Sequence, residues 1–168
     1  MLTHSLLGSS SFSMKAIVLL TAAFLASAIH LASAYEIAGA KPIDKLAAEQ
    51  AKAKQGKKLI CIVYKGADNT CPHCAAAAEN GVKAIKASTE MVVITEEQVK
   101  DKALLGTLPK AVKSMLERQP TNAWVSFTVF DQDMTTIIAS GDRSSLETDR
   151  KAIREFADKV RDARKELK

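Results

Sequence analysis

One short segment constrains the fold of this chain more than any other. Residues 59–64, Leu-Ile-Cys-Ile-Val-Tyr, are apolar without interruption and rich in β-branched side chains. Such a run is typical of a strand buried on both faces of a sheet. Met91–Ile94 predicts a second strand of this kind, and two neighbouring buried strands need a crossover connection between them. We therefore expect an α/β fold: a central mixed β-sheet flanked by helices on both faces.

The expected helices follow from apolar spacing and from start and stop signals. The first uses Ile43, Leu46, Ala47, Gln50 and Ala51 and stops at Gly56. The second runs from Pro72 to about Ala87, although Asn80-Gly81 in its middle should cost about 1 kcal/mol. Residues 96–118 are mostly helical in this interpretation, with interruptions near Gly106 and Pro109.

The last third of the chain predicts a hairpin and a terminal helix. Strands over Ala123–Phe130 and Met134–Ala139 would pair antiparallel across the turn at residues 131–133. Ser144 with Glu147 has the spacing of a capping box that opens the terminal helix. The apolar stripe of this helix is Ile153, Phe156, Ala157, Val160 and Leu167. Trp124, Phe127 and Phe130 are expected in the core.

Residues 1–34 predict a signal peptide rather than folded structure. They carry one charge, Lys15, which is followed by an apolar run and then by Ala32-Ser33-Ala34 before Tyr35. Small residues at that spacing mark a cleavage site, and Met14 is a plausible true start. The domain would then be residues 35–168, exported to the periplasm or secreted. An uncleaved membrane anchor is the alternative, since the apolar stretch approaches the ~20 residues that span a bilayer.

The net charge of +5 does not predict nucleic-acid binding, because the excess is local. Residues 41–58 hold six lysines against Asp44 and Glu49, without interleaved aromatic or arginine residues. A solvated helix face is the expected explanation.

The chemistry is concentrated in Cys71-Pro72-His73-Cys74, placed where a buried strand meets a helix. Cys71 falls at the helix N-cap, where unpaired N–H groups and the helix dipole stabilise a thiolate. Pro72 suits the first helical position, and the i, i+3 spacing brings Cys74 within disulfide reach. His73 adds a nearby donor, or a positive charge when protonated. A stabilised Cys71 thiolate is a good leaving group, so the pair should act as an oxidant.

At these residues the chain resembles the thioredoxin-like superfamily, and its motif is identical to that of the DsbA-type disulfide oxidants. The resemblance implies a compact thioredoxin-like domain in which Cys71 is the exposed attacking cysteine and Cys74 the buried resolving one. The expected partners are protein thiols or disulfides and a redox partner; no cofactor is implied. Two family features are missing: Val125 or Ser126 stands where the family carries a cis-proline, and Val63 where several members carry a buried acid.

Other interpretations of the motif stay open. Cys71 and Cys74 could bind Cu(I) in a metallochaperone-like module, because Cu(I) needs only two or three soft ligands. A zinc site would need four ligands, and Cys61 and His73 are the only further Cys or His after residue 34. An inert disulfide or a non-catalytic interaction domain of the same shape are further possibilities. Cys61, in the middle of the first strand, is expected to be a buried core residue.

Overall fold

A computed structural model describes residues 35–67, 70–119 and 124–167. Within them, one mixed sheet has the strand order β1-β3-β2-β4-β5. Its strands are β1 (Lys41–Pro42), β2 (Leu59–Lys65), β3 (Thr89–Thr95), β4 (Ser126–Phe130) and β5 (Ile137–Asp142). The first three are parallel to one another, whereas β4 runs antiparallel to β2 and β5 antiparallel to β4. The short edge strand β1 was not anticipated from the sequence.

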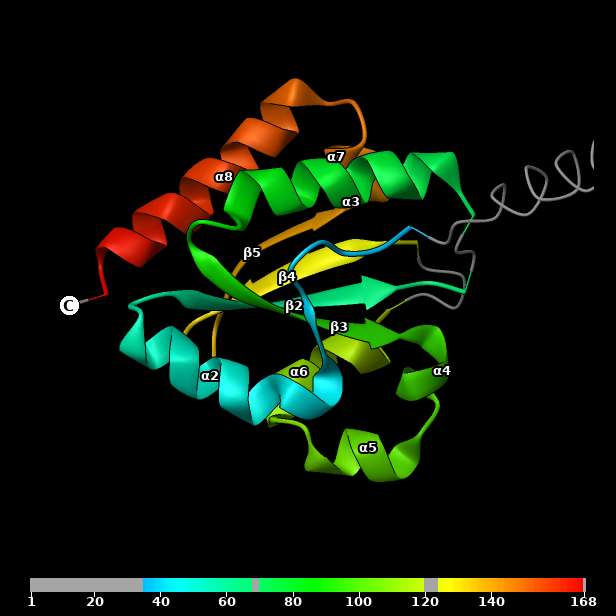
Figure 1. The fold of residues 1–168 in the computed structure, drawn as a ribbon, viewed down its shortest axis with the longest axis vertical. Coiled ribbons are helices and arrows are strands. Elements are labelled where there is room, and N and C mark those ends of the chain that lie inside the picture. The colour runs from blue at the N-terminus through cyan, green and yellow to red at the C-terminus, as the bar shows by residue number, and fades with distance from the viewer. Residues whose placement is uncertain (1–34, 68–69, 120–123, 168) are drawn as a thin grey trace, which may run out of the picture. The chain divides into compact units, whose positions relative to one another are not determined.

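Helices cover both faces of this sheet, as predicted (Figure 1). On one face lie α3 (Pro72–Ile85), α7 (Arg143–Leu146) and α8 (Arg150–Lys165). On the other lie the 3-10 turn η2 (Ile43–Lys45), α2 (Leu46–Gln55), α5 (Lys102–Thr107) and α6 (Lys110–Glu117), with α4 (Glu96–Val99) directly after β3. This strand order, with the crossover helix α3 between β2 and β3, is a thioredoxin-like fold. Residues 1–34, with the predicted signal peptide and Met14, lie outside the described residues.

The central strand β2 is buried on both faces, as its sequence predicts. Alternate side chains enter two separate cores. Leu59, Cys61 and Val63 pack under α3 and α8, whereas Ile60, Ile62 and Tyr64 pack under α2 and α6. The apolar run is uninterrupted because the side chains on both faces of this strand are buried in a core.

The Asn80-Gly81 pair lies inside α3, which continues past it to Ile85. Gly81 is there because α3 packs closely on the sheet: a Cβ at this position would lie 2.6 Å from the ring of Phe127. Asn80 has a different task, since its side-chain amide donates to the backbone carbonyls of Leu146 and Glu147 at 3.0 and 2.9 Å. Two residues of low helix propensity thus stand in the middle of α3, where Gly81 allows close packing on the sheet and Asn80 binds α7.

Three predictions for the last third of the chain are corrected by the structure. Met134 lies in the turn, with a φ of 54°, rather than in a strand, because Asp131 caps the turn through the backbone and hydroxyl of Thr135. The capping box that forms is Asp142 with Ser145, which opens the one-turn helix α7. The long terminal helix α8 instead begins after Asp149, so Glu147 is not part of a capping box at its start; it is the C-cap of α7. The start of the predicted first strand, Ala123, lies outside the described residues.

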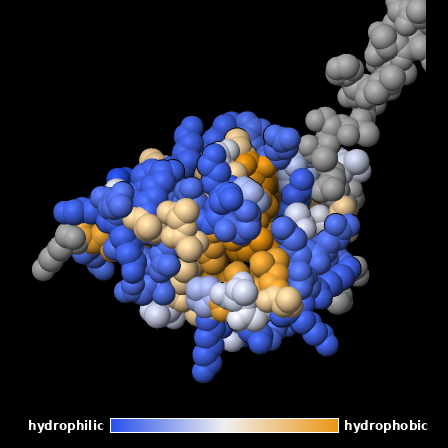
Figure 2. Space-filling view, turned by 60° about the horizontal axis from the view of Figure 1, so that its bottom comes forward, coloured by the Kyte–Doolittle hydropathy of each residue, from blue (hydrophilic) through white to orange (hydrophobic). Residues whose placement is uncertain are grey.

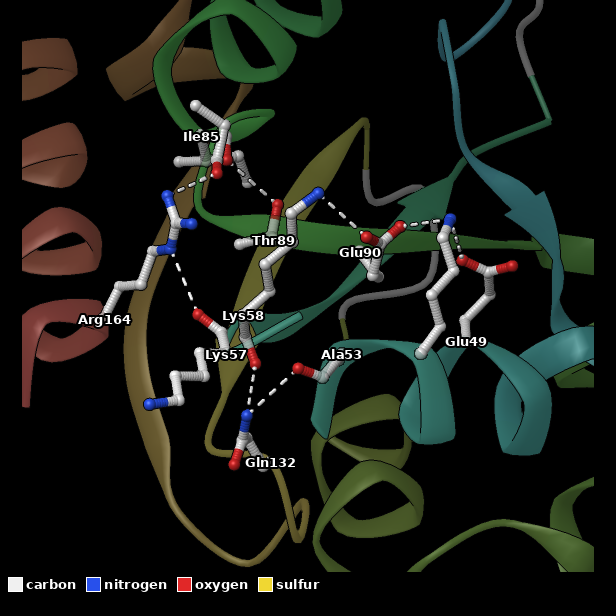
Figure 3. Close-up of polar contacts among 11 residues, drawn as sticks. Glu49, Ala53, Lys57, Lys58, Ile85, Thr89, Glu90, Gln132 and Arg164 are labelled. Carbon is white, nitrogen blue, oxygen red and sulfur yellow. Dashed lines mark hydrogen bonds and ion pairs between the residues drawn. The ribbon is translucent and has the colours of Figure 1, made fainter. Parts of the chain in front are cut away.

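The lysine-rich segment is only partly a solvated face. The buried side of α2 is Leu46, Glu49 and Ala53, whereas the predicted Ala47 and Ala51 are exposed. Lys52 pairs with Glu49 and, at 2.8 Å, with Glu90 of β3; Lys58 binds the other oxygen of Glu90 at 2.9 Å (Figure 3). Desolvation works against the charge of Glu90, but the two lysines outweigh it and hold its pKa below the usual range. The cluster thereby ties α2 to β3.

The face that carries α2 and α5 is not completely closed. A groove of about 360 Å³ lies between these helices, lined by Ile43, Leu46, Leu104, Leu108 and Met134 among others. Figure 2 shows apolar residues gathered in a hollow on this side, bordered by hydrophilic ones. The dithiol motif belongs to the core on the opposite face of the sheet.

Because Gly81 lies so close to the Phe127 ring, a single added methyl group should lower the stability of the protein. Gly81→Ala should destabilise the protein by about 1–2 kcal/mol, because overpacking against Phe127 exceeds the gain in helix propensity. Gly106→Ala in α5 is the matched control, since a Cβ there would meet no other atom within 4 Å and the change should stabilise slightly. Urea denaturation of both variants measures the difference; equal stability of Gly81→Ala and wild type would contradict the packing argument.

Candidate functional site

The Cys-x-x-Cys motif lies at the N-terminus of α3, directly after the loop that follows β2. Cys71 is the N-cap with extended backbone (φ −64°, ψ 113°), and Pro72 occupies the first helical turn. Pro72 is suited to this place because its missing N–H has no partner to lose there. The predicted placement of both residues is confirmed. The positive end of the helix dipole therefore faces the Cys71 sulfur.

Cys71 and Cys74 are present as two thiols rather than as a disulfide, and they belong to the same core cluster. The backbone N–H of Cys74 donates to Cys71 Sγ at 3.4 Å. Cys71 is 7% exposed and Cys74 1% exposed. The expectation that Cys71 is exposed is wrong, because its sulfur lies against the first turn of its own helix. Cys71 is nevertheless the more accessible of the two cysteines.

Cys74 is held as a protonated thiol. Burial, followed by its hydrogen bond to Cys71, raises its pKa to about 11, and the negative charge of a Cys71 thiolate adds to this. A hydrogen bond from the backbone of Val125 and the charge of Arg143 act in the opposite direction and are outweighed. The two sulfurs are therefore in different protonation environments. Cys74 is a protonated thiol that donates a hydrogen bond to Cys71.

Val125 and Ser126 are the two residues that the resemblance places at the position of a cis-proline. The backbone of Val125, directly before β4, hydrogen-bonds to Cys74, whereas Ser126 is already paired with β2. No cis peptide bond occurs in the part of the chain that the structure describes. Val63, which the resemblance places where several members carry a buried acid, is a fully buried core residue.

His73 points away from the core and finds a partner that the sequence did not reveal. Its side chain is 60% exposed, and its Nδ1 is hydrogen-bonded to Oε1 of Glu147, which is 23% exposed. Glu147 follows α7, whose last carbonyls are held by Asn80 of α3. The only sequence signal at Glu147 was its spacing from Ser144, and that spacing favoured a capping box instead.

Trp124 and Arg143 form the other neighbour of the dithiol. Trp124 is 45% exposed, so its prediction as a core residue is wrong, whereas Phe127 and Phe130 are fully buried as expected. The guanidinium of Arg143 lies over the Trp124 ring, 4.4 Å from its centre. Both residues line a pocket of about 240 Å³ together with Val125, whose backbone contacts Cys74. An aromatic ring with a positive charge over it thus lies next to Val125, the residue whose backbone contacts Cys74.

Cys61 takes no part in the site. It is fully buried in the middle of β2, which confirms its prediction as a core residue, and burial raises its pKa strongly. Among the residues that the structure describes, no group of three or more His, Cys, Asp or Glu side chains is placed to hold a metal ion. No helix within those same ranges has the length and apolar character to span a bilayer.

Comparison with known proteins adds little to this geometry. No protein-family model matches the chain, and no curated protein matches it. A disulphide isomerase from Xylella fastidiosa Temecula1 has a similar crystal structure, with a TM-score of 0.45 and 16% sequence identity. The similarity covers 70% of this chain and 89% of that one. The assignment of the fold rests on the strand order and on the crossover helix α3.

The unequal thiols predict selective alkylation of the reduced protein. At pH 8, brief treatment with iodoacetamide should modify Cys71 alone, because Cys74 has a pKa of about 11 and Cys61 is inaccessible. Alkylation of Cys74 should become appreciable only as the pH approaches 11. Peptide mass spectrometry measures the three sites separately; equal rates for Cys71 and Cys74 at pH 8 would contradict the assigned roles.

Proposed function

We propose that this protein is an exported thiol–disulfide oxidoreductase that exchanges disulfides with protein thiols through Cys71 and Cys74. The observation that carries the proposal is the inequality of the two sulfurs at one helix N-terminus. Cys71 is the more accessible and accepts hydrogen bonds, whereas Cys74 is buried and protonated. An attacking and a resolving cysteine need these two environments.

In the oxidising direction, a substrate thiolate attacks Cys71 Sγ and the Cys71–Cys74 bond breaks. The bonding electron pair moves to Cys74, which takes up a proton, as its raised pKa favours. A second substrate thiolate then attacks the substrate sulfur of the mixed disulfide and releases Cys71 as a thiolate. The substrate loses two electrons and gains a disulfide, and the protein gains both electrons as a dithiol.

The reducing direction uses the same groups in reverse. The Cys71 thiolate attacks a substrate disulfide, and Cys74 must lose its proton before it can resolve the mixed disulfide. Val63, at the place of the family's buried acid, has no group that accepts this proton. The proton of Cys74 therefore has to leave to water or to another group before the mixed disulfide is resolved, and its raised pKa slows that step.

Copper binding would have to remove the proton of Cys74, whose pKa burial raises to about 11, so it would release a proton and weaken as the pH falls. Thiol–disulfide exchange needs only the Cys71 thiolate at the start and requires no cofactor. Export through the predicted signal peptide would place the pair in a compartment where such exchange is possible.

The roles of the two cysteines predict which variant accumulates a mixed disulfide. Reduced Cys74→Ser protein incubated with insulin should form a stable Cys71–insulin mixed disulfide, because no resolving thiol remains. Cys71→Ser should form less than a tenth as much, and Cys61→Ala should behave as wild type. Non-reducing electrophoresis and mass spectrometry identify the adduct. Equal adduct yields from Cys71→Ser and Cys74→Ser would overturn the proposal.

A further inference from the structure

His73 has a strong hydrogen-bond partner in the carboxylate of Glu147. The Nδ1 atom of a histidine ring carries at most one hydrogen and can donate it to one acceptor at a time. Because a carboxylate oxygen only accepts, the hydrogen bond between Nδ1 and Oε1 of Glu147 requires Nδ1 to carry the hydrogen and donate it. A carboxylate acceptor makes this bond stronger than one between neutral groups. The Nδ1 hydrogen of His73 is therefore committed to Glu147.

Glu147 is fixed in place from the same helix that carries the motif. Asn80, almost two turns after Cys74 in α3, donates through Nδ2 to the carbonyls of Leu146 and Glu147 at 3.0 and 2.9 Å. The other end of α7 is closed by Asp142, which accepts from the backbone of Ser145 at 3.0 Å. The carboxylate also lies partly out of water, at 23% exposure. The hydrogen bond to His73 thus joins two parts of the molecule that are already held against each other.

The position of this hydrogen affects the balance between dithiol and disulfide. Cys71 Sγ accepts a hydrogen bond from the backbone of Cys74, at the long distance of 3.4 Å. A further donor to the Cys71 thiolate would stabilise the reduced protein and make the disulfide a stronger oxidant. We propose that Glu147 is a positioning residue that lowers the oxidising strength of the Cys71–Cys74 pair by holding the His73 Nδ1–H away from Cys71. This proposal rests on the redox function proposed above.

The other charged residue of α7 acts at a different point. Arg143 lies over Trp124, and its positive charge lowers the pKa of Cys74. A guanidinium carries donors and no acceptor, so Arg143 does not compete with Glu147 for the Nδ1 hydrogen. The two ends of this short helix thus reach different members of the motif, and each can be changed separately.

Glu147→Ala and Glu147→Gln test the proposal through the equilibrium of the purified protein with glutathione. Glu147→Ala should shift the equilibrium constant about tenfold towards the reduced protein, which corresponds to about 30 mV in reduction potential. Glu147→Gln keeps a weaker, uncharged acceptor and should shift it less in the same direction. Glu117→Gln, which changes a carboxylate on α6 that is paired with Lys113, is the matched control and should shift nothing. An unchanged or lowered potential in Glu147→Ala would overturn the proposal.

A second set of variants separates positioning of His73 from a direct effect of charge. In a His73→Ala background, Glu147→Ala should leave the equilibrium constant unchanged, because no Nδ1 hydrogen remains to be released. A shift of the same size in that background would show that the carboxylate acts on Cys71 directly and would overturn the proposal. A potential is not altered by a uniform loss of stability, so weaker folding alone does not imitate the expected result.

The same measurement distinguishes this inference from the proposed function. Failure of the wild-type protein to form a reversible Cys71–Cys74 disulfide with glutathione would overturn the function, and the inference with it. A reversible wild-type couple whose potential is unaffected by Glu147→Ala would overturn the inference alone.

Discussion

Close packing of α3 against the sheet is the constraint on which the site depends. Gly81 lets the helix approach the Phe127 ring more closely than any side chain would allow, and this fixes the height of α3 over β4. The N-terminus of the same helix then places Cys71 after the end of β2 and Cys74 against the backbone of Val125. The reactive pair is therefore positioned by core packing some two turns away, on a helix rather than on a flexible loop.

The second element that the site needs is α7, a helix of one turn that cannot be stable alone. Its capping box, its packing beside Gly141 and the two hydrogen bonds from Asn80 hold it against α3. This helix places the charge of Arg143 near Cys74 and the carboxylate of Glu147 against His73. A segment distant in sequence thus reaches the Cys-x-x-Cys motif, since Glu147 follows His73 by 74 residues.

The fold and the motif could be predicted from sequence because both rest on local signals. The apolar run in β2 predicts burial on both faces, and the Cys-Pro pair predicts its own place at a helix start. The partners of the motif could not be predicted, because they depend on contacts between distant segments. Glu147 has the spacing of a capping-box residue, yet Asp142 and Asp149 provide the actual N-caps of the two helices. Trp124 is a large aromatic residue of the kind expected in a core, but it precedes the strand and remains 45% exposed.

The reduction potential of the Cys71–Cys74 couple, measured in glutathione buffers by mass spectrometry of the alkylated protein, tests the central claim most directly. The account predicts a reversible intramolecular disulfide with a potential less negative than about −300 mV, as for exchange-active pairs. A potential more negative than that, in the range of structural disulfides, would contradict it. Failure of Cys71 and Cys74 to form a disulfide in these buffers would contradict it as well.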